Sequence, residues 1–166
     1  LTEVQEISHS ATRTVDVFGN ATTSQTSNVY DNSATGLVKT KGIVKPSQVR
    51  TRIIEVGFYS DPTTYISGTL LDGSIVSQTE EQASVVDYTY DNQGKLFTVT
   101  DGPQGVVRTT DVFGNWTEVI TVNTYNDALL ARGIIKVETV TTRIVDSENI
   151  DGSVILQPEG QAAVVA

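Results

Sequence analysis

The sequence predicts an all-β fold, a tandem duplication of short antiparallel hairpins that form a continuous or sandwich-like sheet. Three observations support this prediction. Thr and Val are the most frequent residues, and their β-branched side chains favour extended backbone on a pleated surface. Apolar and polar residues alternate in runs such as WTEVITV at 116–122, which is the period of a half-buried strand. Segments of the first half also return, in the same order, in the second half.

The duplication consists of collinear blocks. RTVDVFGN at residues 13–20 returns as RTTDVFGN at 108–115. The other matched blocks are Leu1 and Val4 with Leu96 and Val99, 42–45 with 133–136, 51–54 with 142–145, and 72–86 with 151–165. Because repeats usually correspond to one structural unit each, we divide the chain into copy one, residues 1–95 with a connector at 88–95, and copy two, residues 96–166.

Turn signals separate the expected strands. The pairs Asp72-Gly73, Asp101-Gly102 and Asp151-Gly152 predict type I′ hairpin turns, in which both central residues have positive φ. The two DVFGN segments predict tight turns of one kind. We expect ten or more short strands, a helical turn at 127–132, and a strand or turn at 32–41.

Composition excludes several classes of function. The net charge of −9 argues against nucleic acid as a partner, since phosphate binding relies on clustered Lys and Arg. The chain has no cysteine, and it lacks the run of about 20 apolar residues that a membrane span needs. It begins at Leu1 without an initiator Met or a signal peptide, so we expect a mature, processed or excised piece. The low charged fraction of 19% and the richness in Thr, Ser and Asn favour an extracellular or cell-surface protein.

One segment resembles a known family. Residues 88–102 read YTYDNQGKLFTVTDG, which resembles the YD (Rhs) repeat of large bacterial surface proteins. The matching residues are Tyr88, Tyr90, Asp91, Gly94, Leu96, Val99 and Asp101. A variant of the motif is matched by Asp16, Gly19, Asn20 and Thr22, and again by Asp111, Gly114, Asn115 and Thr117. The resemblance implies β-hairpins that join into long sheets and an extracellular setting.

No residue pattern predicts catalysis, and we expect the chain not to be an enzyme and to need no cofactor. The single histidine, His9, has no nucleophile motif such as G-x-S-x-G near it. Asp87, Asp91 and Asp101 are either calcium ligands that converge around a hairpin or plain turn and surface residues. Without a D-x-[DN]-x-[DN]-G loop, the second interpretation is favoured and no metal site is predicted.

Two kinds of binding or modification site stay open. Asn20 and Asn115 begin N-x-T sequons at matched positions, so each is either a glycosylation site or a turn residue. The segment GFYSDPTTYISG at 57–68 has no counterpart in copy two. Its Tyr59 and Tyr65 form a candidate ligand loop for a surface glycan.

The proposed assembly edges are Leu1, Val4, Val164 and Val165. Each belongs to a segment whose repeat counterpart adjoins the connector at 88–95, and repeat units bury their apolar faces against neighbours. The sequence therefore favours a structural subunit, a homo-oligomer or polymer, of an extracellular filament, tube or shell. The alternative is an adhesin-like module that binds carbohydrate or another surface.

Overall fold

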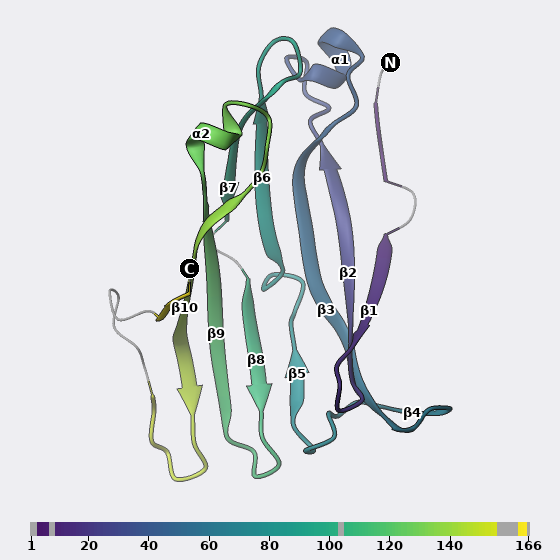
Figure 1. Ribbon diagram of the computed structural model, residues 1–166, viewed down its shortest axis with the longest axis vertical. Coiled ribbons are helices and arrows are strands. Elements are labelled where there is room, and N and C mark those ends of the chain that lie inside the picture. Colours follow the sequence, from purple (N-terminus) through teal and green to yellow (C-terminus); the bar gives the residue numbers. More distant parts are fainter. Residues whose placement is uncertain (1–2, 7–8, 103–104, 156–162, 166) are drawn as a thin grey trace.

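The computed structural model describes residues 3–6, 9–102, 105–155 and 163–165 (Figure 1). Strands account for 54% of the chain and helices for 6%, so the predicted all-β class is confirmed. The described residues form eleven strands in two antiparallel sheets, together with two short helices.

The first sheet has the strand order β1-β2-β3-β6-β7, with β4 paired to β3. Its two longest strands are β2 and β3, and β2 pairs with β3 along its whole length, from Asn20↔Phe58 to Tyr30↔Pro46. The strands are β1 (Ser10–Val15), β2 (Asn20–Tyr30), β3 (Pro46–Asp61), β4 (Thr64–Ser67), β6 (Ser84–Tyr90) and β7 (Leu96–Asp101).

The second sheet has the order β11-β10-β9-β8-β5. By the alignment of the two copies, β8, β9, β10 and β11 are the counterparts of β1, β2, β3 and β6. The counterparts are neighbours in the second sheet in the same sequence as β1-β2-β3-β6 in the first. The strands are β5 (Ile75–Ser77), β8 (Val106–Thr110), β9 (Trp116–Tyr125), β10 (Val137–Glu148) and β11 (Ala163–Val165).

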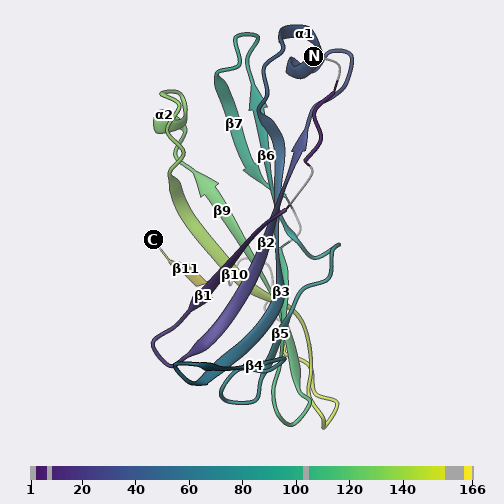
Figure 2. The ribbon, with the colours of Figure 1, turned by 90° about the vertical axis from the view of Figure 1, so that its right-hand side faces the viewer.

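The sheets lie close together at one end of the molecule and diverge towards the other, where α1 (Leu37–Lys41) and α2 (Asp127–Leu130) lie on separate arms (Figure 2). β7 pairs with β6 in the first sheet and also contacts β9 in the second, and therefore connects the two. Several of the buried apolar residues lie on these three strands, namely Val85, Val99 and Ile120.

One turn type occurs five times in the described parts of the chain. In each turn, the glycine N–H donates to the carbonyl three residues earlier, and the first residue's N–H donates to the carbonyl four residues later. The glycine has positive φ, as in a hairpin that combines a type I turn with a bulge. The predicted identity of the two DVFGN turns is confirmed. The five turns begin at Asp16, Leu70, Asp91, Asp111 and Asn149.

The type I′ prediction was wrong. Among the described residues, no residue other than glycine has positive φ, so Asp72 and Asp151 do not occupy the conformation that a type I′ turn requires. Each instead accepts a backbone hydrogen bond from the serine two residues later. The predicted turn at Asp101-Gly102 is absent, because β7 and the following strand β8 belong to different sheets.

The β2–β3 and β9–β10 connections each contain a short helix. The helical turn predicted at 127–132 is confirmed as α2, with Asn126 as its N-cap. The strand or turn expected at 32–41 was correct only for the first part of this range, where the Gly36 N–H donates to the Ser33 carbonyl in a turn. It was wrong for the rest, because α1 forms there. Val38 is 1% exposed, and Gly42 ends the helix with φ of 67°. Burial of Val38 and the glycine cap explain why this segment is helical despite few strong helix formers.

Candidate functional site

The two copies are joined by exchanged strands. β5 belongs to copy one but pairs with β8 of copy two, with Ile75↔Thr110 and Val76↔Thr109 in register. In the other direction, β7 of copy two pairs with β6 of copy one. Figure 1 shows β5 beside β8, at the border between the sheets. We call these pairings, with the contacts around them, the junction.

Side chains of copy one extend the pairing of β5 with β8. Gln78 Nε2 donates to the Val106 carbonyl oxygen at 3.1 Å, and Gln82 Nε2 donates to Glu118 Oε1 at 3.0 Å. The turn at Gly73 also touches copy two, because a Cβ added to this glycine would lie 2.5 Å from Val112 Cγ1. A glycine at this position therefore permits close approach of the two copies.

β1 corresponds to β8 but pairs in the described chain with β2 alone. All six residues of β1 are exposed, whereas β8, covered by β5, is mostly half-buried. Val17, the counterpart of Val112, is 94% exposed, against 59% for Val112. We call β1 and Val17 the acceptor edge. Its counterpart in copy two, β8 with Val112, is covered by β5 and the Gly73 turn of copy one.

The backbone direction of the acceptor edge follows from its turn. The Asp16 N–H donates to the Asn20 carbonyl at 2.9 Å, towards β2. Backbone groups alternate in direction along a strand, and β1 pairs with β2 without a bulge. Thr14 therefore also faces β2, while Arg13 and Val15 direct their N–H and C=O groups towards the open edge.

Residues 151–155 are the counterpart of 72–76, and we call them the donor segment. Val154 and Ile155 are 56% and 53% exposed. Within the described part of the chain, nothing lies within 4 Å of a Cβ added to Gly152, the counterpart of Gly73. The Ile155 N–H donates to Ser147 Oγ at 2.6 Å and its carbonyl accepts from the same hydroxyl at 2.7 Å, so one side of this segment is anchored to β10.

The sequon asparagines hold turns together. Asn20 Nδ2 donates to Asp16 Oδ2 at 3.0 Å, and Asn115 Nδ2 donates to Asp111 Oδ2 at 2.7 Å. These bonds hold the pKa of each aspartate below its usual range. The amide groups of Asn20 and Asn115 are thus part of the fold, which accounts for the G-N pair without a glycan.

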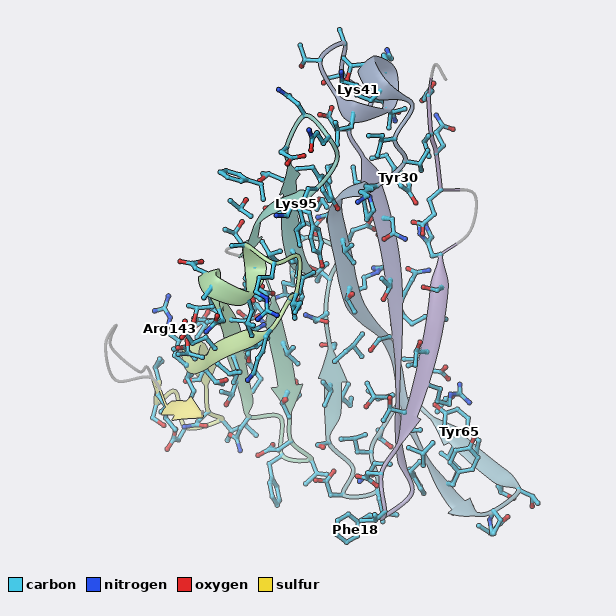
Figure 3. All side chains as sticks on the ribbon, turned by 45° about the horizontal axis from the view of Figure 1, so that its top comes forward. Phe18, Tyr30, Lys41, Tyr65, Lys95 and Arg143 are labelled. Carbon is cyan, nitrogen blue, oxygen red and sulfur yellow. The ribbon has the colours of Figure 1, made fainter. Side chains whose placement is uncertain are left out.

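The candidate ligand loop packs on its own sheet. Tyr59 and Tyr65 have ring centroids 5.2 Å apart, and the Arg13 guanidinium lies 4.3 Å from the centre of the Tyr65 ring. Tyr65 lies on the β3–β4 hairpin, beside β1 (Figure 3). In copy two, Arg108 stacks in the same way on Trp116, at 4.0 Å. The inserted hairpin therefore supplies the ring that copy one lacks, since Ala21 is the counterpart of Trp116.

The polar residues considered for catalysis or calcium have separate partners. His9 Nδ1 lies 3.3 Å from Glu6 Oε2. Asp87 accepts from Gln48, Asp91 from turn amides, and Asp101 from Asn123 and Tyr125. Burial and the Asp101 carboxylate raise the pKa of Tyr125. In the described ranges, no three acidic or histidine side chains group as metal ligands.

The predicted assembly edges lie in different places. Val164 and Val165 lie in β11 and pair with Thr141 and Val140 of β10. The Val4 backbone exchanges two hydrogen bonds with the Asn32 side chain, at 2.9 and 2.8 Å. Leu1 is outside the described residues. Sequence reasoning did not identify β1, Val17 or the donor segment, although the alignment of 151–155 with 72–76 contained the signal for the last of these.

No known protein family, curated protein or solved structure matches the chain. Within the described residues, no helix is long and apolar enough to cross a membrane.

Proposed function

We propose that this chain is a structural repeat subunit of an extracellular filament, tube or shell, and that its copies assemble through open strand edges. The observation that supports this is the junction. The pairing of β5 with β8 joins copy one to copy two, and the counterparts of both partners, the donor segment and β1, lack such a partner in the described chain.

The acceptor edge and the donor segment are unlike surfaces, which favours an open assembly over a closed dimer. An interface between two unlike patches is heterologous, and repetition of it produces a ring or an open helical polymer rather than a closed dimer. β1 carries no Lys or Pro, the residues that natural sheets use to block edge pairing. The acceptor edge is therefore suited to strand addition.

The resemblance to YD repeats agrees with this proposal. Residues 84–101 form a hairpin of β6 and β7, and its turn is held by Asp91, whose Oδ1 accepts from the N–H groups of Gln93 and Lys95. Membership of that family and an extracellular location are parts of the proposal.

The proposal is tested by analytical ultracentrifugation and negative-stain microscopy of the wild-type protein over a range of concentrations. We expect species larger than a monomer that grow with concentration. Val15→Pro should prevent assembly, because it removes an outward N–H at an edge where proline is tolerated. Val15→Ala keeps that N–H and should assemble like the wild type. A wild-type protein that stays monomeric at the highest concentration would overturn the proposal.

A second proposal is an adhesin-like surface module. The β3–β4 hairpin projects beyond the two sheets (Figure 1) and carries exposed residues at its tip, including Asp61 and Thr64. A glycan array with the wild-type chain and with Tyr59→Ala tests this. Binding to a defined glycan that the variant loses would support it, and absence of binding across the array would exclude the glycan partner.

A further inference from the structure

We infer that the partner of the acceptor edge is the donor segment of a neighbouring chain, paired antiparallel with Ile155 opposite Thr14 and Val154 opposite Val15. This inference rests on the proposed function and specifies its interface. It makes each contact between chains a repetition of the junction already present within one chain.

The register follows from the junction. Val76 lies opposite Thr109 and Ile75 opposite Thr110. In the sequence repeat, Ile155 is the counterpart of Val76, and Val154 is the counterpart of Ile75. Likewise, Thr14 is the counterpart of Thr109, and Val15 is the counterpart of Thr110. Substituting each residue by its counterpart produces the inferred pairs without adjustment.

The backbone hydrogen bonds of both partners agree with this register. Both backbone groups of Ile155 are bound to Ser147, and those of Thr14 face β2, as derived from the Asp16 bond. Ile155 and Thr14 therefore form a pair that exchanges no hydrogen bonds with each other. The adjacent residues Val154 and Val15 direct their groups at the open sides, so they supply the bonds.

The side chains at the turn agree as well. In the junction, the Val112 side chain lies against Gly73. Between chains, Val17 would lie against Gly152, and both have the space for this contact. Val17 is 94% exposed, and no described atom lies within 4 Å of a Cβ on Gly152. Each chain therefore carries both sides of this contact, Val17 at the acceptor edge and Gly152 in the donor segment.

The acceptor edge and the donor segment cannot satisfy each other within one chain. β1 lies at the outer side of the first sheet, and the donor segment follows β10 in the second sheet, on the opposite side of the molecule in Figure 1. Pairing between them therefore links two chains, and each added chain again presents both surfaces.

A disulfide cross-link tests the register. The chain has no cysteine, so Thr14→Cys with Ile155→Cys introduces the only pair. Residues opposite each other without mutual hydrogen bonds have Cα atoms about 4.5 Å apart, which a disulfide can span. We expect oxidation of the double variant to produce a ladder of covalent oligomers on non-reducing gels. A mixture of the two single variants should stop at the dimer, and neither single variant should dimerise alone.

Two controls accompany this experiment. Val76→Cys with Thr109→Cys places the same pair within one chain and should form an internal disulfide without oligomers. Val15→Cys with Ile155→Cys is out of register by one residue, which turns the side chains to opposite faces, and should cross-link at least tenfold less. Circular dichroism of each variant verifies the fold.

The outcomes separate this inference from the proposed function. Assembly of the wild type without a ladder from Thr14→Cys/Ile155→Cys, or a stronger ladder from the out-of-register pair, would overturn the inferred register and leave the proposed function standing. Absence of both assembly and cross-links would overturn the two together. A ladder specific to the in-register pair supports the inference.

Discussion

The side-chain oxygen of Asn20 accepts a hydrogen bond of 2.8 Å from the backbone N–H of Leu71. The corresponding oxygen of Asn115 accepts one of 2.7 Å from Ile150. Asn20 thereby connects the turn after β1 to the turn at Asp72-Gly73, and Asn115 connects the turn after β8 to the turn at Asp151-Gly152. At the junction, Gly73 lies in the turn that Asn20 holds and Val112 lies in the turn that contains Asn115, so these asparagines position the interface.

Replacing Asn115 with Ala should lower the free energy of unfolding by about 1–2 kcal/mol, because hydrogen bonds to Asp111 and Ile150 are lost. Urea denaturation measures this. Thr117→Ala removes the sequon but leaves both bonds intact, and therefore separates glycosylation from packing. If the two variants were equally destabilised, the hydrogen bonds of Asn115 would not be the cause.

Gly114→Ala should destabilise the chain by about 1 kcal/mol, because Gly114 has φ of 91° and alanine is strained there. Gly19 has the same φ of 91°, and the Cβ of an alanine at this position would also lie 3.0 Å from the Tyr59 carbonyl oxygen. The loss at Gly19 should therefore be larger. Thermal unfolding of both variants measures the order, and a neutral Gly114→Ala would contradict the turn geometry.

Acid should weaken the fold through Asp16 and Asp111. Their pKa values are lowered in the folded state, with the hydrogen bond from the neighbouring asparagine as the largest cause. A lowered pKa stabilises the folded state above the unfolded pKa of about 3.9. This stabilisation is lost as the pH falls from about 4 through the folded pKa. Urea midpoints between pH 7 and pH 2 should show it, and the Asp16→Asn/Asp111→Asn variant should show a shallower decline.

Tyr65→Leu should destabilise copy one by about 0.5–1 kcal/mol, because the cation–π contact with Arg13 is lost. Tyr65→Phe keeps the ring and should stay close to the wild type. Denaturation curves of the two variants distinguish the ring from the hydroxyl group. Equal losses would show that stacking on Arg13 does not stabilise the hairpin.

Salt should promote assembly. Each chain carries a net charge of −9, so neighbouring chains repel one another, and screening shortens the range of that repulsion to about 3 Å at 1 M salt. We expect the concentration needed for assembly to fall as sodium chloride is raised. Light scattering over a salt series measures this. Dissociation by salt would instead indicate that ion pairs hold the interface.

The sequence by itself determined the features that depend on neighbouring residues. Strand-forming composition and alternation predicted the all-β class, and the DVFGN segments predicted one shared turn, because a glycine with positive φ and an aspartate side chain set that turn locally. The helical turn at 127–132 was also predicted from local residues, and in the structure its cap is local too, since the Asn126 side chain accepts from the Leu129 N–H. α1 was missed, since burial of Val38 is a tertiary effect that outweighs local propensity.

The tertiary structure decided which strands pair. Nothing near Ile75 in the sequence specifies Thr110 as its partner, because strand pairing is non-local and many edges offer the same backbone groups. For the same reason, the repeat could not show that β5 crosses into the second sheet, or that Gly73 faces Val112. Only the arrangement of both copies in space reveals that one junction is complete, while the counterparts of its two halves, the acceptor edge and the donor segment, have no such partner among the described residues.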